Sequence, residues 1–208
     1  MLISTLAIAA ALTPTPAQFS ARVTNPYFPA LPGMRWVYRG VDGGRRLRDA
    51  VRVTAHVETV AGAPCATVRD KVFLNGRLAE DTVDWFSQDS RGTVWYFGES
   101  TRELDRHGRV TSTEGSWRAG VRGARPGILM PPKPRVGQVF EQEHFAGHAE
   151  DHFKVVARIA AAVETVEWTP LEPGVRDGKW YARGMGMIRE QTLKGPRERA
   201  NLVSFSRG

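Results

Sequence analysis

The sequence predicts an all-β, mainly antiparallel fold: a meander sheet curled into a barrel, a half-barrel or a sandwich, with at most a short helix. Short runs of β-branched and aromatic residues recur about every 8 to 12 residues, and turn-forming residues separate them. No long helical pattern alternates with these runs, so a parallel α/β fold is not expected. The 208 residues suit a single domain that is large enough to bury a core.

The first 17 residues carry no charged side chain and have the pattern of a secretory signal. Their apolar run, Leu2 to Leu12, is shorter than the roughly 20 residues that a spanning helix needs. Small and turn-forming residues then lead to a cleavage position after Ala17. The missing Lys or Arg before the apolar run leaves a wrongly assigned start as the alternative. We expect a secreted, periplasmic or cell-envelope protein with no stable membrane span after cleavage.

Residues 18–34 are predicted to form an extended lead-in, because Pro26, Pro29 and Pro32 are incompatible with a helix. Residues 35–208 form the predicted β domain. Its first strands lie at 36–39 and at 51–57, where apolar and polar residues alternate. Asn75 and Gly76 predict a tight hairpin turn between strands 66–74 and 78–86.

Residues 81–98 read as a second hairpin of aromatic strands around a turn at 89–92. The five glycines and four prolines of residues 115–137 predict a long loop, and loops of this length are often functional. Strand patterns resume at 138–145, 152–159, 163–168, 178–182, 187–193 and 200–205. The alanines within 155–166 leave a short helix as the alternative there.

The net charge of +7 is unevenly distributed along the chain. Residues 106–135 hold seven basic residues against Glu114 alone, whereas 141–151 hold four acidic residues and no Lys or Arg. A basic patch fits an anionic ligand or surface, and a solvated or internally paired face is the alternative. Export argues against a nucleic-acid partner.

The six tryptophans indicate either a barrel whose lined mouth binds an apolar ligand or a filled core without a cavity. For the first alternative, the candidate ligand-binding residues are Trp95, Trp117, Arg118, Arg122, Arg125 and Met130.

Histidines alternate with carboxylates in the acidic segment, which is the composition of a metal site. The candidate ligands are His144, His148, His152, Glu150 and Asp151. Spacing of four would suit a helix, but on a strand four residues span roughly 13 Å, which is too far for one metal unless a turn at 146–147 folds them together. Paired carboxylates at Asp81 and Asp84, or at Glu99 and Glu103, are further candidates for hydrolytic chemistry.

Other catalytic patterns are missing from the sequence. There is no G-x-S-x-G nucleophile elbow and no G-K-[ST] phosphate loop, and the single cysteine, Cys65, reads as a small buried side chain rather than a nucleophile. We expect no cofactor, and an enzyme is the less favoured class.

Four strings carry a family resemblance: VTNPYFPALPGMRWVYRG, DWFSQDSRGTVWYFGE, STEGSWRAGVRGARPGILMP and TPLEPGV. Between about Val23 and Glu190 they resemble a family of exported bacterial β-rich proteins of unknown function, distantly like the periplasmic lipoprotein-carrier half-barrels. The resemblance implies a half-barrel fold. It also implies that this chain lacks a strand and a turn that its relatives have between the positions of Val163 and Thr169. It supplies no catalytic residues.

The sequence thus predicts an exported, non-enzymatic binding or envelope-accessory module for a small apolar or anionic ligand, of unknown oligomeric state. The alternative is a carboxylate- or metal-dependent hydrolase that uses the 141–152 segment.

Overall fold

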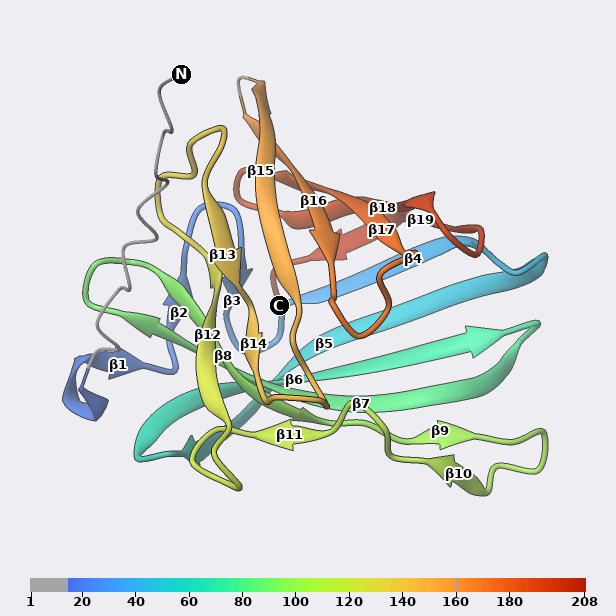
Figure 1. Cartoon of the computed structure of the whole chain (residues 1–208), viewed down its shortest axis with the longest axis horizontal. Coiled ribbons are helices and arrows are strands. Elements are labelled where there is room, and N and C mark those ends of the chain that lie inside the picture. The colour runs from blue at the N-terminus through green and yellow to red at the C-terminus, as the bar shows by residue number, and fades with distance from the viewer. Residues whose placement is uncertain (1–14, 160) are drawn as a thin grey trace, which may run out of the picture.

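The computed structural model describes residues 15–159 and 161–208 and confirms the all-β prediction. Antiparallel strands form one meander sheet that curls until it is nearly closed into a barrel (Figure 1). Within the described residues the only helical element is the 3-10 turn η1 (Pro16–Gln18). The predicted signal segment lies almost wholly outside the described residues. No helix among those described has the length and apolar character to cross a membrane.

The strands fall into a lead-in, a first meander, a connecting region and a second meander. The lead-in contains β1 (Phe19–Ser20), β2 (Val23–Thr24) and β3 (Pro29–Ala30). The first meander contains β4 (Arg35–Asp42), β5 (Arg45–Val60), β6 (Ala63–Leu74), β7 (Arg77–Asp89) and β8 (Val94–Ser100). The connecting region contains β9 (Glu103–Leu104), β10 (Val110–Ser112), β11 (Trp117–Arg118), β12 (Arg125–Met130), β13 (Val139–Glu141) and β14 (Glu143–His144). The second meander contains β15 (His152–Ile159), β16 (Ala162–Trp168), β17 (Arg176–Ala182), β18 (Gly186–Lys194) and β19 (Glu198–Ser206).

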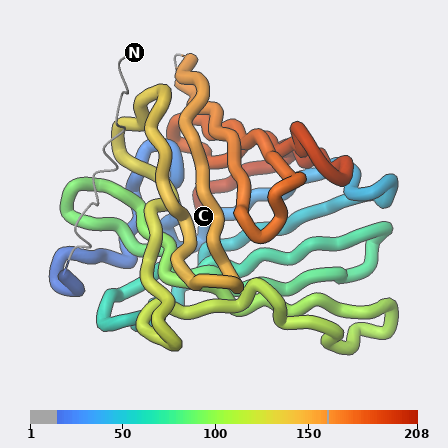
Figure 2. Tube along the Cα trace, in the orientation of Figure 1, coloured from blue at the N-terminus to red at the C-terminus, as the bar shows by residue number. Residues whose placement is uncertain are grey.

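The two meanders are joined through their outer strands. The last strand, β19, pairs with β4, and the register runs from Glu198 opposite Asp42 to Ser206 opposite Arg35. On the other side β12 pairs with both β8 and β14, while β13 pairs with β15. Figure 2 shows the sequential order of the first meander as a gradual change from blue to green across neighbouring strands. Local hairpins therefore build each meander, and only a few long-range pairings curl them around one interior.

The predicted turns and hairpins of the first meander are confirmed. Asn75 and Gly76 both have positive φ, as a two-residue hairpin turn requires, and they join β6 to β7. The hairpin predicted for residues 81–98 is β7 paired with β8. In the second meander, the short helix considered for 155–166 does not form, because these residues belong to the paired strands β15 and β16.

The prediction of a long loop over residues 115–137 was wrong in part. Residues 117–118 and 125–130 form β11 and β12, and both strands pair with β8. Gly127 allows β12 to approach the chain at Gln142 closely, since a Cβ there would lie 2.1 Å from the Gln142 carbonyl oxygen. Gly127 therefore serves close strand packing, whereas the other four glycines of this segment have positive φ and lie outside the strands.

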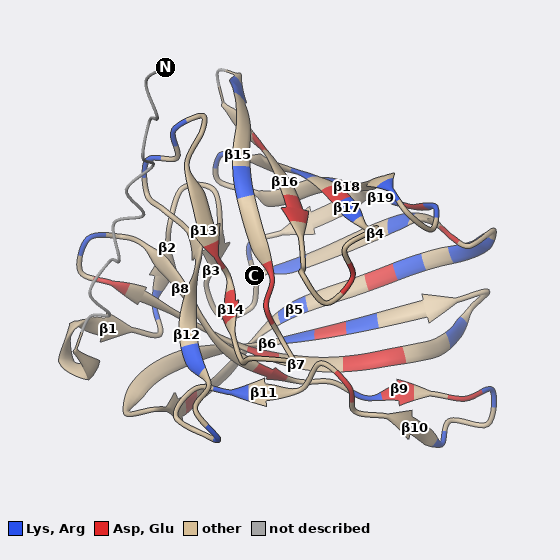
Figure 3. Ribbon diagram, in the orientation of Figure 1, with Lys and Arg blue, Asp and Glu red and all other residues tan. Residues whose placement is uncertain are grey.

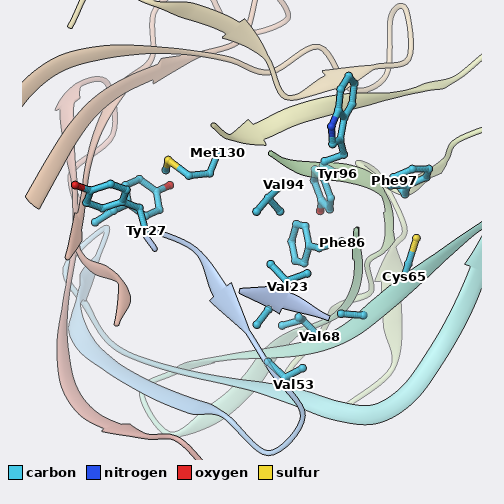
Figure 4. Close-up of a cluster of buried hydrophobic side chains, with 14 of the residues drawn as sticks. Val23, Tyr27, Val53, Cys65, Val68, Phe86, Val94, Tyr96, Phe97 and Met130 are labelled. Carbon is cyan, nitrogen blue, oxygen red and sulfur yellow. The ribbon is translucent and has the colours of Figure 1, made fainter. Parts of the chain in front are cut away.

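The lead-in contributes directly to the hydrophobic core. Val23 and Tyr27 are almost completely buried beside Phe86, Val94 and Met130, as the close-up in Figure 4 shows. Asn25 fixes this segment because its Nδ2 donates to the carbonyl oxygens of Gly92 and Met130, at 2.9 and 3.2 Å. The apolar core therefore fills part of the interior and leaves the remainder for the site described next.

Candidate functional site

The interior holds a cavity of about 670 Å3, lined by residues from both meanders and the connecting region. Its walls carry an excess of acidic side chains. The nine lining carboxylates are Asp70, Asp84, Glu99, Glu103, Glu114, Glu143, Asp151, Glu167 and Glu172. The basic or titratable cationic side chains in the same lining are Lys179 and His148. Figure 3 shows acidic segments on β7, β14 and β16, three of the strands around this interior.

A β-bulge places the central groups of the site. Asp84 on β7 lies directly opposite Glu99 on β8, and Phe86 lies opposite Tyr96. Side chains alternate along a regular strand, so residues 96 and 99 would normally point to opposite faces. The register shift between these two pairs adds one residue to β8 and turns Tyr96 and Glu99 to the same side.

Gly98 makes this bulge possible. Its φ of +128° is favoured only for glycine, and a Cβ at this position would lie 2.3 Å from the carbonyl oxygen of Trp117. The local sequence Trp-Tyr-Phe-Gly-Glu therefore encodes both the bulge and the close approach of β11.

The hydroxyl of Tyr96 lies between two carboxyl groups. Its oxygen is 2.7 Å from Asp84 Oδ1 and 3.0 Å from Glu99 Oε2. A tyrosine hydroxyl has one proton, so it donates to only one carboxylate at a time, and the second contact is a hydrogen bond only when that carboxyl is protonated. The geometry therefore favours a state in which at least one of the two carboxyls retains its proton.

The electrostatic surroundings agree with this geometry. Burial, together with the charges of Asp84 and Glu143, raises the pKa of Glu99 to about 9. Burial also raises the pKa of Asp84 to about 7, although the hydrogen bond from Tyr96 opposes the shift. Both values follow from placing like charges together in a poorly solvated site.

Glu143 is the third carboxyl of this group. Trp117 donates its indole Nε1–H to Glu143 Oε1 at 3.2 Å, and the ring of Trp117 packs edge-on against Tyr96. Burial and the neighbouring Asp151 raise the pKa of Glu143 to about 8, while the Trp117 hydrogen bond and Lys179 act in the opposite direction. We refer to Asp84, Glu99 and Glu143 as the carboxyl triad.

The one lysine of the lining is already neutralised. Lys179 Nζ lies 2.9 Å from Glu167 Oε2 and 3.4 Å from Glu190 Oε1. Burial alone would lower the pKa of Lys179, but these two carboxylates outweigh it and raise the pKa. Tyr181 adds a hydrogen bond to Glu167 at 3.3 Å. Lys179 therefore offers little positive charge to a ligand.

A further acidic position lies on the neighbouring strand β6, diagonal to Asp84 across the β6–β7 pair. Asp70 on β6 faces the cavity, and its Oδ1 is buried with no hydrogen-bond partner among the described residues. Burial raises the pKa of Asp70 and of its neighbour Asp49 on β5, and each carboxyl acts on the pKa of the other. Asp70 thus places a buried carboxyl at the cavity wall, in contact with the carboxyl of Asp49.

Aromatic and aliphatic side chains complete the walls. Trp36, Tyr38, Phe86 and Tyr181 line the cavity together with Leu129. Tyr38 is oriented by a hydrogen bond from its hydroxyl to the Met187 carbonyl oxygen at 3.0 Å. Aromatic faces stabilise both apolar groups and cations, so these walls suit a ligand that has both.

The structure separates the predicted ligand-binding residues from this cavity. None of the six lines it within the described residues. Trp95, Trp117 and Met130 are buried in the apolar core, and Trp117 reaches the site only through Glu143 and Tyr96.

The three predicted arginines have other contacts. Arg118 pairs with Glu58 at 2.7 Å and lies over the ring of Trp85, Arg122 lies over Phe145, and Arg125 stands opposite His144 in the β12–β14 pair. Arg118 is therefore already partnered, and none of the three reaches the cavity.

The five candidate metal ligands are likewise not brought together, and the described residues contain no group of three or more His, Cys, Asp or Glu arranged to hold a metal. His144 and His152 lie near Glu141, at 2.7 and 3.8 Å, while Glu150 accepts a hydrogen bond from the Gly147 backbone. Only His148 and Asp151 line the cavity. Segment 141–152 also contributes Gln142, Glu143 and Ala149 to the lining, and other strands supply the remaining residues.

Fold and site together define the structural class of this protein: it is an antiparallel β meander, nearly closed into a barrel, around an acidic and aromatic cavity. No family model matches the chain, and neither does any curated protein. Among solved structures, the chain is similar to a protein of Parabacteroides distasonis described as a putative lipoprotein. The two share 11% sequence identity and superpose with a TM-score of 0.44, and the match covers 88% of this chain and 99% of the other. This likeness is too distant to indicate a shared function.

Proposed function

We propose that this protein is a non-enzymatic binding module of the cell envelope that binds a small organic cation with an apolar body. The observation that carries the proposal is the cavity, where the carboxyl triad faces aromatic walls and Lys179, the one lysine among the described lining residues, is neutralised by Glu167 and Glu190. The sequence pointed to an apolar or anionic ligand. The apolar part of that prediction is kept, but the acidic lining supports a cation over an anion.

Size and chemistry both fit such a ligand. A cavity of about 670 Å3 lies within the range of small-molecule sites, roughly 300 to 1,000 Å3. A bound cation would favour the ionised forms of Asp84, Glu99 and Glu143, which otherwise repel one another. Trp36 and Tyr38 would cover its apolar part. The exposed carboxylates Glu103, Glu114 and Glu172, where the lining meets solvent, would attract it by charge.

Three probes with the same aromatic body and different charge test the proposal. Isothermal titration calorimetry with benzyltrimethylammonium, benzyl alcohol and benzoate should show the cation binding at least about tenfold more tightly than the alcohol, with benzoate weakest. Equal binding of all three, or preference for benzoate, would overturn the cation assignment. Absence of binding by every probe and by larger alkylammonium ions would count against a binding role for the cavity.

Two matched variants locate the binding. At pH 9, where about half of Glu99 is ionised, Glu99→Gln removes one carboxylate of the triad and should weaken cation binding about tenfold or more, with little effect on benzyl alcohol. Glu164→Gln makes the same change on the outer face of β16, opposite Trp180, and should leave both affinities unchanged. An equal effect of the two variants would show that the cation responds to overall charge and not to the cavity.

The pH dependence gives an independent test, because a quaternary ammonium keeps its charge at every pH. Asp84, Glu143 and Glu99, with pKa values of about 7, 8 and 9, lose their protons as the pH rises, and only the ionised forms attract the cation. The affinity for benzyltrimethylammonium should therefore increase between pH 6 and pH 9. A flat or falling profile contradicts the role of the triad.

A carboxylate-dependent hydrolase is the second candidate, and one observation favours it. Asp84 Oδ1 and Glu99 Oε2 are no more than about 5.7 Å apart, since each contacts the same Tyr96 hydroxyl at 2.7 and 3.0 Å. Retaining glycosidases hold two carboxyls about 5 to 5.5 Å apart. Here, however, the hydroxyl of Tyr96 fills the space where a scissile bond would lie. Hydrolysis of aryl glycosides that is lost in Asp84→Asn would establish the hydrolase and displace the binding proposal.

A further inference from the structure

Seven arginines gather on the outer face of the sheet, away from the cavity. Because opposite residues in a strand pair share a face, the registers of β18, β19, β4 and β5 place their side chains on one surface. All seven are exposed, and none forms an ion pair within the described residues. They are Arg35, Arg39, Arg46, Arg48, Arg52, Arg189 and Arg199, which we call the arginine face.

The closest neighbours on this face carry the same charge. Arg35 stands directly opposite Arg52, and Arg39 directly opposite Arg48, in the β4–β5 pair. Like charges at directly opposite positions destabilise a sheet. No carboxylate lies between them, because the outward positions of β4 between Arg35 and Val41 hold only Val37 and Arg39. The fold therefore tolerates repulsion that a bound anionic surface would relieve.

The shape of the face indicates what kind of anion fits. Neighbouring strands are about 4.8 Å apart and residues four apart along a strand are roughly 13 Å apart, so the arginines spread in two dimensions over four strands. A linear polyanion needs a track and, for single strands, aromatic platforms. The two aromatic rings beside the face are covered, since Arg48 lies over Phe73 at 5.0 Å and Arg189 over Trp180 at 4.7 Å. A planar array of phosphates suits this face better.

We infer that the arginine face docks the protein onto an anionic phospholipid bilayer, with guanidinium groups contacting lipid phosphates. Arginine suits this role because its planar fork pairs with phosphate oxygens in a bidentate manner. Figure 3 shows basic bands recurring along β4 and β5, on strands whose inward residues include Tyr38 and Asp49. The docking face and the cavity therefore lie on opposite sides of the same strands.

Vesicle sedimentation with the full protein tests the inference. Phosphatidylcholine vesicles containing 30% phosphatidylglycerol should retain the protein at low ionic strength, pure phosphatidylcholine vesicles should not, and raising the salt should release it. Each arginine near an anionic surface contributes about fivefold to partitioning, so replacing Arg35, Arg39, Arg48 and Arg52 with Gln should weaken binding several-hundred-fold.

A matched variant separates this face from overall charge. Replacing four exposed basic residues of the connecting region (Arg106, Arg125, Lys133 and Arg135) with Gln changes the net charge equally and should weaken vesicle binding far less. The first variant should also melt at a higher temperature, because it removes two like-charge pairs, which shows that it is folded. Equal losses in both variants, equal binding to neutral vesicles, or binding of DNA without binding of vesicles would overturn the inference.

Discussion

Replacing Glu99 by Gln should stabilise the protein, and the gain should grow with pH. Glu99 has a pKa of about 9 in the fold, mainly because it is buried, against 4.5 for the ordinary side chain. Between these values the native state keeps a proton that the unfolded state has lost. Each pH unit in this window therefore lowers the free energy of unfolding by about 1.4 kcal/mol. Glutamine is neutral at every pH and can keep a hydrogen bond to the Tyr96 hydroxyl, so it avoids this loss.

The magnitude follows from the same pKa. At pH 7, which is 2.5 units above 4.5, wild-type Glu99 costs up to about 3 kcal/mol, and solvent screening at the cavity surface lowers this value. At pH 5 the cost is below about 1 kcal/mol. The melting temperature of the variant should exceed that of the wild type by up to roughly 6 to 12 °C at pH 7, and by much less at pH 5.

Thermal unfolding followed by circular dichroism at pH 5, 6, 7 and 8 measures this difference directly. Glu164→Gln on the outer face is the control and should change the melting temperature little at any pH. A gain that stays constant with pH would mean that charge burial at Glu99 is not its cause. A loss of stability at pH 7 would refute the assignment of Glu99 as a buried carboxyl held protonated by the fold.

Three further predictions concern other parts of the interior. Gly98→Ala should destabilise the protein by several kcal/mol in a denaturant titration and abolish cation binding, because the new Cβ would meet the Trp117 carbonyl oxygen. Gly108→Ala is the control, since Gly108 also has positive φ but open space around it, and it should cost only about 1 kcal/mol. Lys179→Met leaves Glu167 and Glu190 without their cation and should lower the free energy of unfolding by about 3 to 5 kcal/mol at pH 8. The loss should be smaller at pH 5, because burial raises the pKa of Glu190 and favours its protonated form. Cys65 is buried, and burial raises the pKa of its thiol to about 12. It should therefore resist iodoacetamide at pH 8 in the native state and react at once in 6 M guanidinium. Rapid labelling of the native protein would show that the core around Cys65 opens.

Local signals in the sequence were sufficient to predict the strands and hairpins of the first meander. Asn75-Gly76 specifies a turn by its own backbone preference, and the alternating residues after Val51 specify a strand through side-chain direction. The strand at 125–130 was missed because nothing local requires it. Its partners, Tyr96 on β8 and His144 on β14, lie far away in sequence, and its Gly and Pro residues are typical of loops.

The site was harder to predict than the fold, because the pattern of polar and apolar residues does not say which polar residues point inward. Asp84 and Glu99 look like solvated strand residues until the bulge at Gly98 is known to bring them to Tyr96. A signal was present in Trp-Tyr-Phe-Gly-Glu, where a glycine interrupts an aromatic strand, and an interior glycine of this kind often marks a bulge. The sequence placed the basic patch at residues 106–135. It did not indicate the arginines of β4 and β5, because their common face depends on the pairing of these strands with each other and with β19.

The first meander separates charge across its thickness, and this arrangement connects the two proposals. On β5, Arg48 and Arg52 point outward while Asp49 points inward, because successive side chains alternate between the faces of a strand. An organic cation is repelled by the outer face and attracted by the exposed carboxylates at the cavity edge, so it should enter there. A docked bilayer also adds negative charge on the outer side of these strands, and nearby negative charge disfavours ionisation of the inner carboxyls. Docking onto an anionic bilayer should therefore raise the pKa of the carboxyl triad and weaken cation binding near pH 8. Calorimetry with benzyltrimethylammonium in the presence and absence of anionic vesicles would measure this coupling, and tighter cation binding on the vesicles would contradict it.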